Sequence, residues 1–195
     1  MSLYADADQQ PRTVNTTDRG NLDIKALVLL AVLLAAGFVL NLTVGKAIAA
    51  LTANAISPEF IISAFCLTIL VVRPNVGQAL VIGLISAAVI QITTTSPFVD
   101  FAAEGVAAVV MALIVNAGMR SGAKAIIPAV GTLVTTVLSG VIFMVIKLAI
   151  SGFSPELVTA MPAAMLPVVF ATAVFNAVLV AVLYPLVRGV LKVTD

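Results

Sequence analysis

The chain has no histidine, no tryptophan and a single cysteine, Cys66. Zinc sites, haem sites and intramembrane proteases draw on histidine and cysteine side chains, so this scarcity argues against all three. Cys66 lies in an apolar run, where a thiol behaves as a small buried hydrophobe. The phosphate-binding motif G-x-x-x-x-G-K-[ST] is also missing from the sequence. We therefore expect no enzyme activity, no cofactor and no metal site, and any ATP hydrolysis is expected from partner subunits.

Charged residues are also scarce: they make up 10% of the 195 residues, whereas hydrophobic residues make up 62% and the mean hydropathy is +1.20. An average soluble domain is about 25% charged. The apolar residues fall into stretches of about 20 residues, the length that a hydrocarbon core of ~30 Å requires. The sequence thus predicts an all-α polytopic membrane protein, a bundle of six transmembrane helices in residues 25–191 that is embedded in a lipid bilayer. Residues 1–24 are polar and are predicted to form a disordered cytoplasmic tail.

Capping residues and prolines divide the membrane domain into its predicted spans. Asp23 is a suitable N-cap for the first helix. Three Ser-Pro pairs, at 57–58, 96–97 and 154–155, suit helix starts because serine caps a helix and proline fits its first turn. The predicted spans are 25–45, 57–73, 76–92, 98–117, 125–150 and 165–187. The loops 46–57, 93–97 and 151–164 then share one side of the membrane.

The basic residues indicate which side of the membrane each loop faces. Most of the 10 Lys and Arg residues fall at span ends that share one side. These are Arg12, Arg19, Lys25, Arg73, Arg120, Lys124, Arg188 and Lys192. Because cytoplasmic loops are enriched in Lys and Arg, both termini are predicted to lie in the cytoplasm. The opposite face gathers polar and acidic residues, and there we expect a ligand; we expect no nucleic-acid partner.

Two acids and one lysine are the main candidates for ligand binding. Asp100 and Glu104 are spaced i, i+4 and share one face at the outer end of the fourth span. They either hold an ammonium or amide donor of a substrate or are solvated acids at a helix N-terminus. Lys147 either binds a ligand or reaches the interface by snorkelling. It ends a polar stripe along the fifth span, which comprises Thr132, Thr136, Ser139, Phe143 and Lys147.

Two amides within the spans also need partners. Asn176 stands near the middle of the sixth span, and Gln91 lies near the outer end of the third. An amide at membrane depth is costly unless it is hydrogen-bonded, so either a neighbouring helix or a ligand must satisfy it.

A zwitterionic amino acid would need a cation for its carboxylate, an acceptor for its ammonium group and apolar walls. Lys147 could bind the carboxylate of the amino acid, and Asp100 or Glu104 could accept from its ammonium group. Phe98 and Phe143 could supply stacking surface.

The first span also carries a face of small residues. Ala31 and Ala35 form an A-x-x-x-A pair, and such faces let another helix approach closely. We expect either a partner protein or a helix of the same chain to pack there.

Three stretches resemble a known family: VGQALVIGLISAAVIQITTTSP at 76–97, GTLVTTVLSGVIFMVIKLAISG at 131–152, and LPVVFATAVFNAVLVAVLYPLVRGVL at 166–191. Together with six short spans and the A-x-x-x-A pair, they are similar to the substrate-binding S components of energy-coupling factor (ECF) transporters. The tryptophan-transport family is the most similar among them.

The resemblance implies a division of labour in the plasma membrane of a prokaryote. An S component binds a vitamin or an amino acid such as tryptophan from outside. It then docks on a transmembrane scaffold subunit driven by two ATPase subunits and topples to release the ligand inside. Ala31 and Ala35 match the docking motif, while Thr94, Thr95 and Pro97 match the loop before the fourth span. The alternative is a structural membrane scaffold of the cell-wall elongation type, which has a similar size but no small-molecule substrate.

Overall fold

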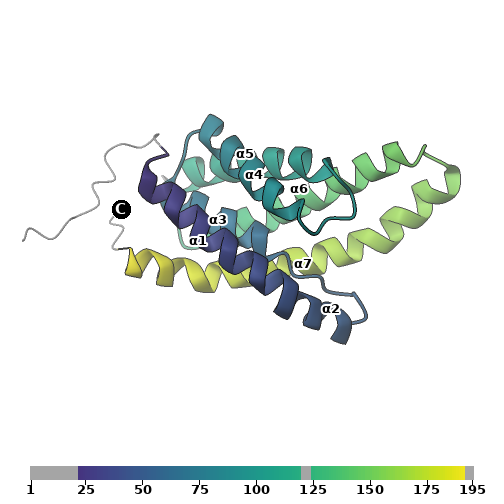
Figure 1. The fold of residues 1–195 in the computed structure, drawn as a ribbon, viewed down its shortest axis with the longest axis horizontal. Helices are drawn as coiled ribbons and strands as arrows, with labels where there is room; N and C mark the ends of the chain where they lie inside the picture. The colour runs from purple at the N-terminus through teal and green to yellow at the C-terminus, as the bar shows by residue number, and fades with distance from the viewer. Residues whose placement is uncertain (1–21, 120–123, 192–195) are drawn as a thin grey trace, which may run out of the picture.

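The computed structural model describes residues 22–119 and 124–191, which are almost entirely helical and include no strand (Figure 1). The predicted all-α class is confirmed. The helical elements are α1 (Ile24–Leu40), the π-helical turn η1 (Asn41–Gly45), α2 (Lys46–Leu51), α3 (Phe60–Val72), α4 (Val76–Ile90), α5 (Val99–Gly118), α6 (Ile127–Ile150) and α7 (Pro155–Val190). The predicted tail, apart from its last three residues, and the basic residues Arg120 and Lys192 lie outside the described part of the chain.

Four helical segments among the described residues are long and apolar enough to cross a membrane. They are Ile24–Leu51, Val99–Gly118, Ile127–Ile150 and Pro155–Val190. The apolar helices α3 and α4 are shorter, with 13 and 15 residues. At about 1.5 Å per residue, each falls short of a ~30 Å hydrocarbon core. Exposed valines and leucines on α1, α4, α6 and α7 give an apolar outer surface, which suits lipid better than water. These features indicate a membrane-embedded protein.

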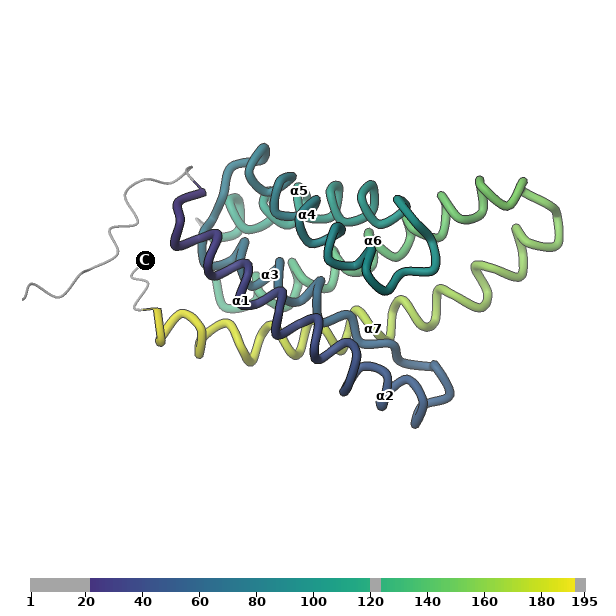
Figure 2. Tube along the Cα trace, viewed as in Figure 1, coloured from purple at the N-terminus to yellow at the C-terminus, as the bar shows by residue number. Residues whose placement is uncertain are grey.

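Helix α3 runs through the middle of the bundle. Every residue from Phe60 to Leu70 is buried, and α3 contacts α1, α4, α5, α6 and α7. Consecutive helices from α4 to α7 pack against one another around it. The start of α1 and the end of α7 lie at one end of the bundle, and the turn between α6 and α7 projects at the other (Figure 2).

The first and last predicted spans are too short. Helices α1, η1 and α2 form one continuous run to Leu51, past the predicted end at Gly45 and into the predicted loop 46–57. Helix α7 begins at Pro155, so residues 155–164 are helical and the predicted loop 151–164 is wrong. Pro162 and Pro167 both lie inside the helix. An interior proline removes one backbone hydrogen bond but does not have to end a helix within a membrane protein.

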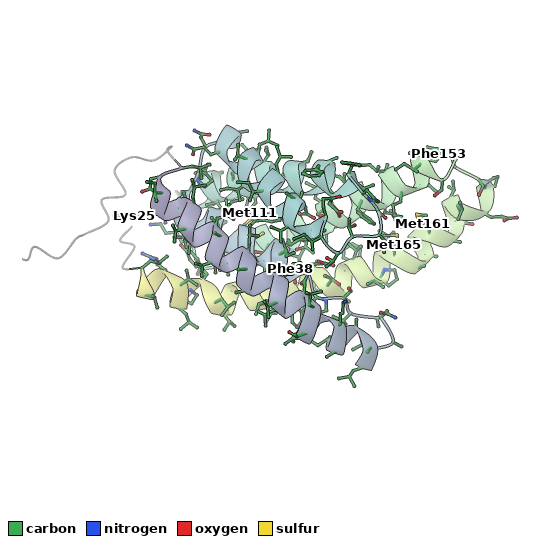
Figure 3. All side chains as sticks on the ribbon, viewed as in Figure 1. Lys25, Phe38, Met111, Phe153, Met161 and Met165 are labelled. Atoms are coloured by element: carbon green, nitrogen blue, oxygen red, sulfur yellow. The ribbon has the colours of Figure 1, made fainter. Side chains whose placement is uncertain are left out.

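The projecting end of the α6–α7 hairpin carries Phe153, Met161 and Met165 (Figure 3). No residue of α7 from 155 to 171 is buried, whereas Thr172 and Ala173 are. The second half of α7 therefore makes the packed contacts, and the first half stands at the edge of the bundle.

The caps of the helices are partly as predicted. The Asp23 side chain accepts the Ala26 N–H (2.8 Å) and caps α1, and Ser154 caps α7 by accepting the Leu157 N–H (3.3 Å). The predicted caps at Ser57 and Ser96 are wrong. Helix α3 starts after Glu59, whose own side chain does not cap it. The residue before α5 is Phe98, in the left-handed region with φ 69°.

Candidate functional site

Glu104 is a carboxylate buried at the centre of the candidate site. It lies on α5 and is only 3% exposed. The Ser139 hydroxyl of α6 donates to its Oε1 atom (2.7 Å), while its Oε2 atom is buried without a hydrogen-bond partner. A buried carboxyl oxygen without a hydrogen-bond partner is costly. Of the two alternatives for this acid, the solvated one does not hold at Glu104, because protein encloses the side chain.

The backbones of α4 and α5 touch beside Glu104. A Cβ atom at Gly83 would lie 2.5 Å from the carbonyl oxygen of Glu104 and 2.8 Å from the Ala108 Cβ. Only glycine allows an approach this close. The contact positions the half of α5 nearer Val99, and with it the Glu104 side chain.

Asp100 lies one turn before Glu104 and is 6% exposed. The Gln91 amide donates to its Oδ2 atom (3.2 Å), the Thr94 hydroxyl also hydrogen-bonds to it, and the positive charge of Lys147 acts on it. The other end of the Gln91 amide accepts the Phe98 N–H (3.0 Å). Gln91 thus joins the end of α4 to the start of α5 and holds Asp100 in place.

Glu59 is a third carboxyl group of this site and was not among the residues predicted to bind a ligand. The Asn41 amide donates to its Oε2 atom (3.3 Å) and accepts the Phe60 N–H (2.7 Å). Burial raises the pKa of Glu59 to about 7, the Asn41 hydrogen bond lowers it, and the negative charge of Asp100 raises it further. The sequence could have indicated a role for Glu59 in the site. This acid directly follows the Ser57-Pro58 pair on the side of the membrane where a ligand was predicted.

Asn176 lies on α7 and is fully buried. Its amide nitrogen donates to the Thr136 hydroxyl of α6 (3.4 Å), and its Oδ1 atom is buried without a partner. Ser139 follows Thr136 by three residues, so the side chains that reach Asn176 and Glu104 share one face of α6. The predicted polar stripe on α6 is confirmed in its first part, since Thr132, Thr136 and Ser139 are all buried.

The segment before α3 has an irregular backbone whose polar groups are satisfied by side chains. The Thr172 hydroxyl of α7 donates to the Ser57 carbonyl (3.0 Å) and accepts the Ser57 N–H (3.2 Å). Thr52 accepts the Ile56 N–H (3.3 Å). Non-helical backbone within a membrane protein requires such partners, and these bonds hold Glu59 beside α7.

Other predicted site residues lie at the margin. Lys147 is half-buried, with its Nζ atom 5.6 Å from the centre of the Phe143 ring. Phe98 is 77% exposed and stacks on Phe101, and Thr95 is exposed. Neither Phe98 nor Thr95 is therefore brought into the buried cluster.

Ala31 and Ala35 are both exposed on α1. On the same helix, Ala26, Leu30, Leu34 and Gly37 face the protein interior. The A-x-x-x-A pair therefore packs on no other helix within residues 22–119 and 124–191, and its small side chains face outward.

Within residues 22–119 and 124–191, no group of three or more His, Cys, Asp or Glu side chains could hold a metal ion. Comparison with known proteins gives no match: no protein-family model, no curated protein and no solved structure matches the chain.

Proposed function

We propose that this protein is the substrate-binding membrane subunit, or S component, of an ECF-type importer. It captures a small nutrient, such as tryptophan or a vitamin or its precursor, at the outer face of a prokaryotic plasma membrane. Separate subunits supply the energy for delivery inward.

One observation carries the proposal: buried polar atoms without partners lie in an apolar helical bundle. Glu104 Oε2 and Asn176 Oδ1 are enclosed and make no hydrogen bond to any residue that the structure describes. A buried polar atom costs free energy until a partner satisfies it. A structural scaffold gains nothing from such atoms, whereas a binding subunit uses them to hold a ligand.

The outward face of α1 supports the second part of the proposal, which is docking on a transmembrane scaffold subunit. Ala31 and Ala35 leave that face flat, and flat small-residue faces let a partner helix approach within the membrane. The ATPase subunits would act through that scaffold, since this chain lacks a phosphate-binding motif.

The orientation also belongs to the proposal. The first turn of α1 and the last turns of α7 lie on the same side of the bundle (Figure 1). Lys25 belongs to the first of these segments and Arg188 to the second. The positive-inside rule favours the cytoplasm for that end. The cluster around Glu59 and Asp100 then faces outward.

Ligand binding by the purified chain tests the first part. We expect a vitamin, a nucleobase or an aromatic amino acid to raise the melting temperature in detergent and to bind at equilibrium. If no member of such a panel binds, the cell-wall scaffold becomes the better account.

Uptake by whole cells tests the second part. Ala31→Leu and Ala35→Leu are expected to abolish uptake and leave ligand binding intact, because the added side chains block the approach of a partner. Ala117→Leu, at an exposed position of α5, is the matched control. Unchanged uptake in the α1 variants would remove the docking surface from the proposal.

A further inference from the structure

The titratable groups that act on Glu104 are acids. Both charges that act on Glu104 come from carboxylates, those of Glu59 and Asp100. The one cation that acts on this group is Lys147, through Asp100, and its ammonium also lies near the Phe143 ring. Three carboxyl groups of this region therefore interact with one another and with one lysine, and such groups avoid mutual repulsion either by holding a proton or by taking up a cation.

Two acceptor oxygens in this region lack donors. Glu104 Oε2 on α5 and Asn176 Oδ1 on α7 are both buried and unpartnered. The remaining polar atom of each side chain is bonded to α6, at Ser139 and Thr136 respectively. These two hydroxyls lie one turn apart on the same face of α6, so the Glu104 and Asn176 side chains both meet that face. Acceptors in this arrangement call for a donor group between α5, α6 and α7.

The chemistry of the missing group follows from the charges. A divalent metal would need a set of acidic or thiol ligands, and the described residues contain no such set. An anion would meet three carboxylates. A zwitterion, which the sequence alone suggested, would need Lys147 for its carboxylate, but Lys147 already acts on Asp100. A protonated nitrogen supplies both the positive charge and the N–H donors.

We propose that this site takes a small organic molecule with net positive charge, whose protonated nitrogen donates to Glu104 Oε2 and Asn176 Oδ1. The inference rests on the proposed function and specifies its substrate class. It replaces the zwitterion that the pairing of Lys147 with an acid had suggested.

The experiment identifies what the protein carries. The full chain is purified from its native membranes, and the small molecules released on denaturation are quantified by mass spectrometry. The recovered molecule is then returned to the purified protein for equilibrium binding. Three variants are compared with wild type: Glu104→Gln, Lys147→Ala and Val145→Ala. Val145 is an exposed residue of α6 and serves as the matched control.

We expect the recovered molecule to carry a protonated nitrogen and net positive charge at pH 7. Glu104→Gln keeps the shape of the side chain and removes its charge, so affinity should fall by about 10- to 100-fold. Lys147→Ala removes a like charge and should tighten binding by about two- to tenfold. Val145→Ala should bind as wild type does.

Three results would overturn the inference. A neutral, zwitterionic or anionic molecule, or a loss of affinity in Lys147→Ala as large as in Glu104→Gln, sinks the cationic substrate and leaves the proposed function standing. A higher melting temperature in NaCl than in KCl at equal ionic strength would indicate sodium binding. If Glu104→Gln abolishes that difference, the site holds a sodium ion instead of an organic cation. If wild-type protein releases no small molecule and its melting temperature does not respond to the nutrient panel, both the inference and the proposed function fail.

Discussion

The two halves of α5 share one helix but have different surroundings. In the half nearer Gly118, Ala107, Met111 and Val115 are fully buried in the apolar core. In the half nearer Val99, Asp100 and Glu104 are just as well enclosed, yet they meet hydroxyls, amides and other charges. The apolar half is satisfied by packing alone. The polar half retains a Glu104 oxygen without a hydrogen-bond partner. The apolar half therefore stabilises the bundle, and the polar half is the one that can bind a ligand.

Truncation in the apolar half should have the largest effect on stability. Met111→Ala removes a fully buried side chain that contacts α6 near Gly131 and leaves a cavity, so we expect a loss of about 2–5 kcal/mol in the free energy of unfolding. Leu113→Ala, at a half-exposed position of the same helix, should cost much less. Denaturant unfolding in detergent measures both. Equal losses would mean that the core packing around Met111 is not as described.

In the polar half, stability should depend on pH through Glu59. Its pKa is raised from 4.5 to about 7 in the folded state, mainly by burial, so the folded protein holds this proton more tightly than the unfolded chain does. The resulting stability is fully present below about pH 4.5 and is lost as the pH rises through about 7, by up to about 3 kcal/mol. Glu59→Gln mimics the protonated acid and should remove this part of the pH dependence. Melting curves of wild type and variant between pH 4.5 and 8 provide the comparison, and parallel curves would contradict the burial of Glu59.

The contact between α4 and α5 links the two halves. In Gly83→Ala the new Cβ would meet the backbone of Glu104, so we expect a loss of about 1–3 kcal/mol in stability together with weaker ligand binding. Gly189→Ala is the control, because a Cβ there meets nothing within 4 Å. A tolerated Gly83→Ala would show that α4 and α5 are farther apart at this level.

The smallest effect should come from a single hydrogen bond. Ser139→Ala removes the donor to Glu104 Oε1 and should cost about 0.5–1.5 kcal/mol in stability or binding. Ser63→Ala removes a buried hydroxyl that has no partner and should be close to neutral. Thermal unfolding with and without ligand separates the two variants. An equal response would mean that the Ser139 bond contributes nothing.

Much of the fold could be predicted from the sequence, because apolar runs and end signals act locally. Asp23 caps its own helix, and the stripe from Thr132 to Ser139 needs only the helical period to place its side chains on one face. The start of α7 was missed for a local reason too. A proline followed by an acid, as in Pro155-Glu156, is typical of a loop, whereas the helix starts there and continues.

The site could be predicted only in part, because some of its contacts join residues that are far apart in the chain. Asp100, Glu104 and Asn176 stand out as polar residues within apolar runs. The role of Glu59 depends on Asn41, which lies 18 residues before it, and on its nearness to Asp100. No periodic pattern in the sequence reveals such a neighbour. The same holds for Thr172, which bonds Ser57 across 115 residues.

The position of α3 constrains how this protein is made. The helix is enclosed on all sides, yet its neighbours α6 and α7 are synthesised after it. Roughly 120 residues follow α3 before α7 is complete, which takes on the order of 6–24 s at about 5–20 residues per second. During that interval the faces of α3 that α6 and α7 will cover have only lipid or an insertion factor beside them. A chain cut before α7 would stop permanently at this half-assembled stage.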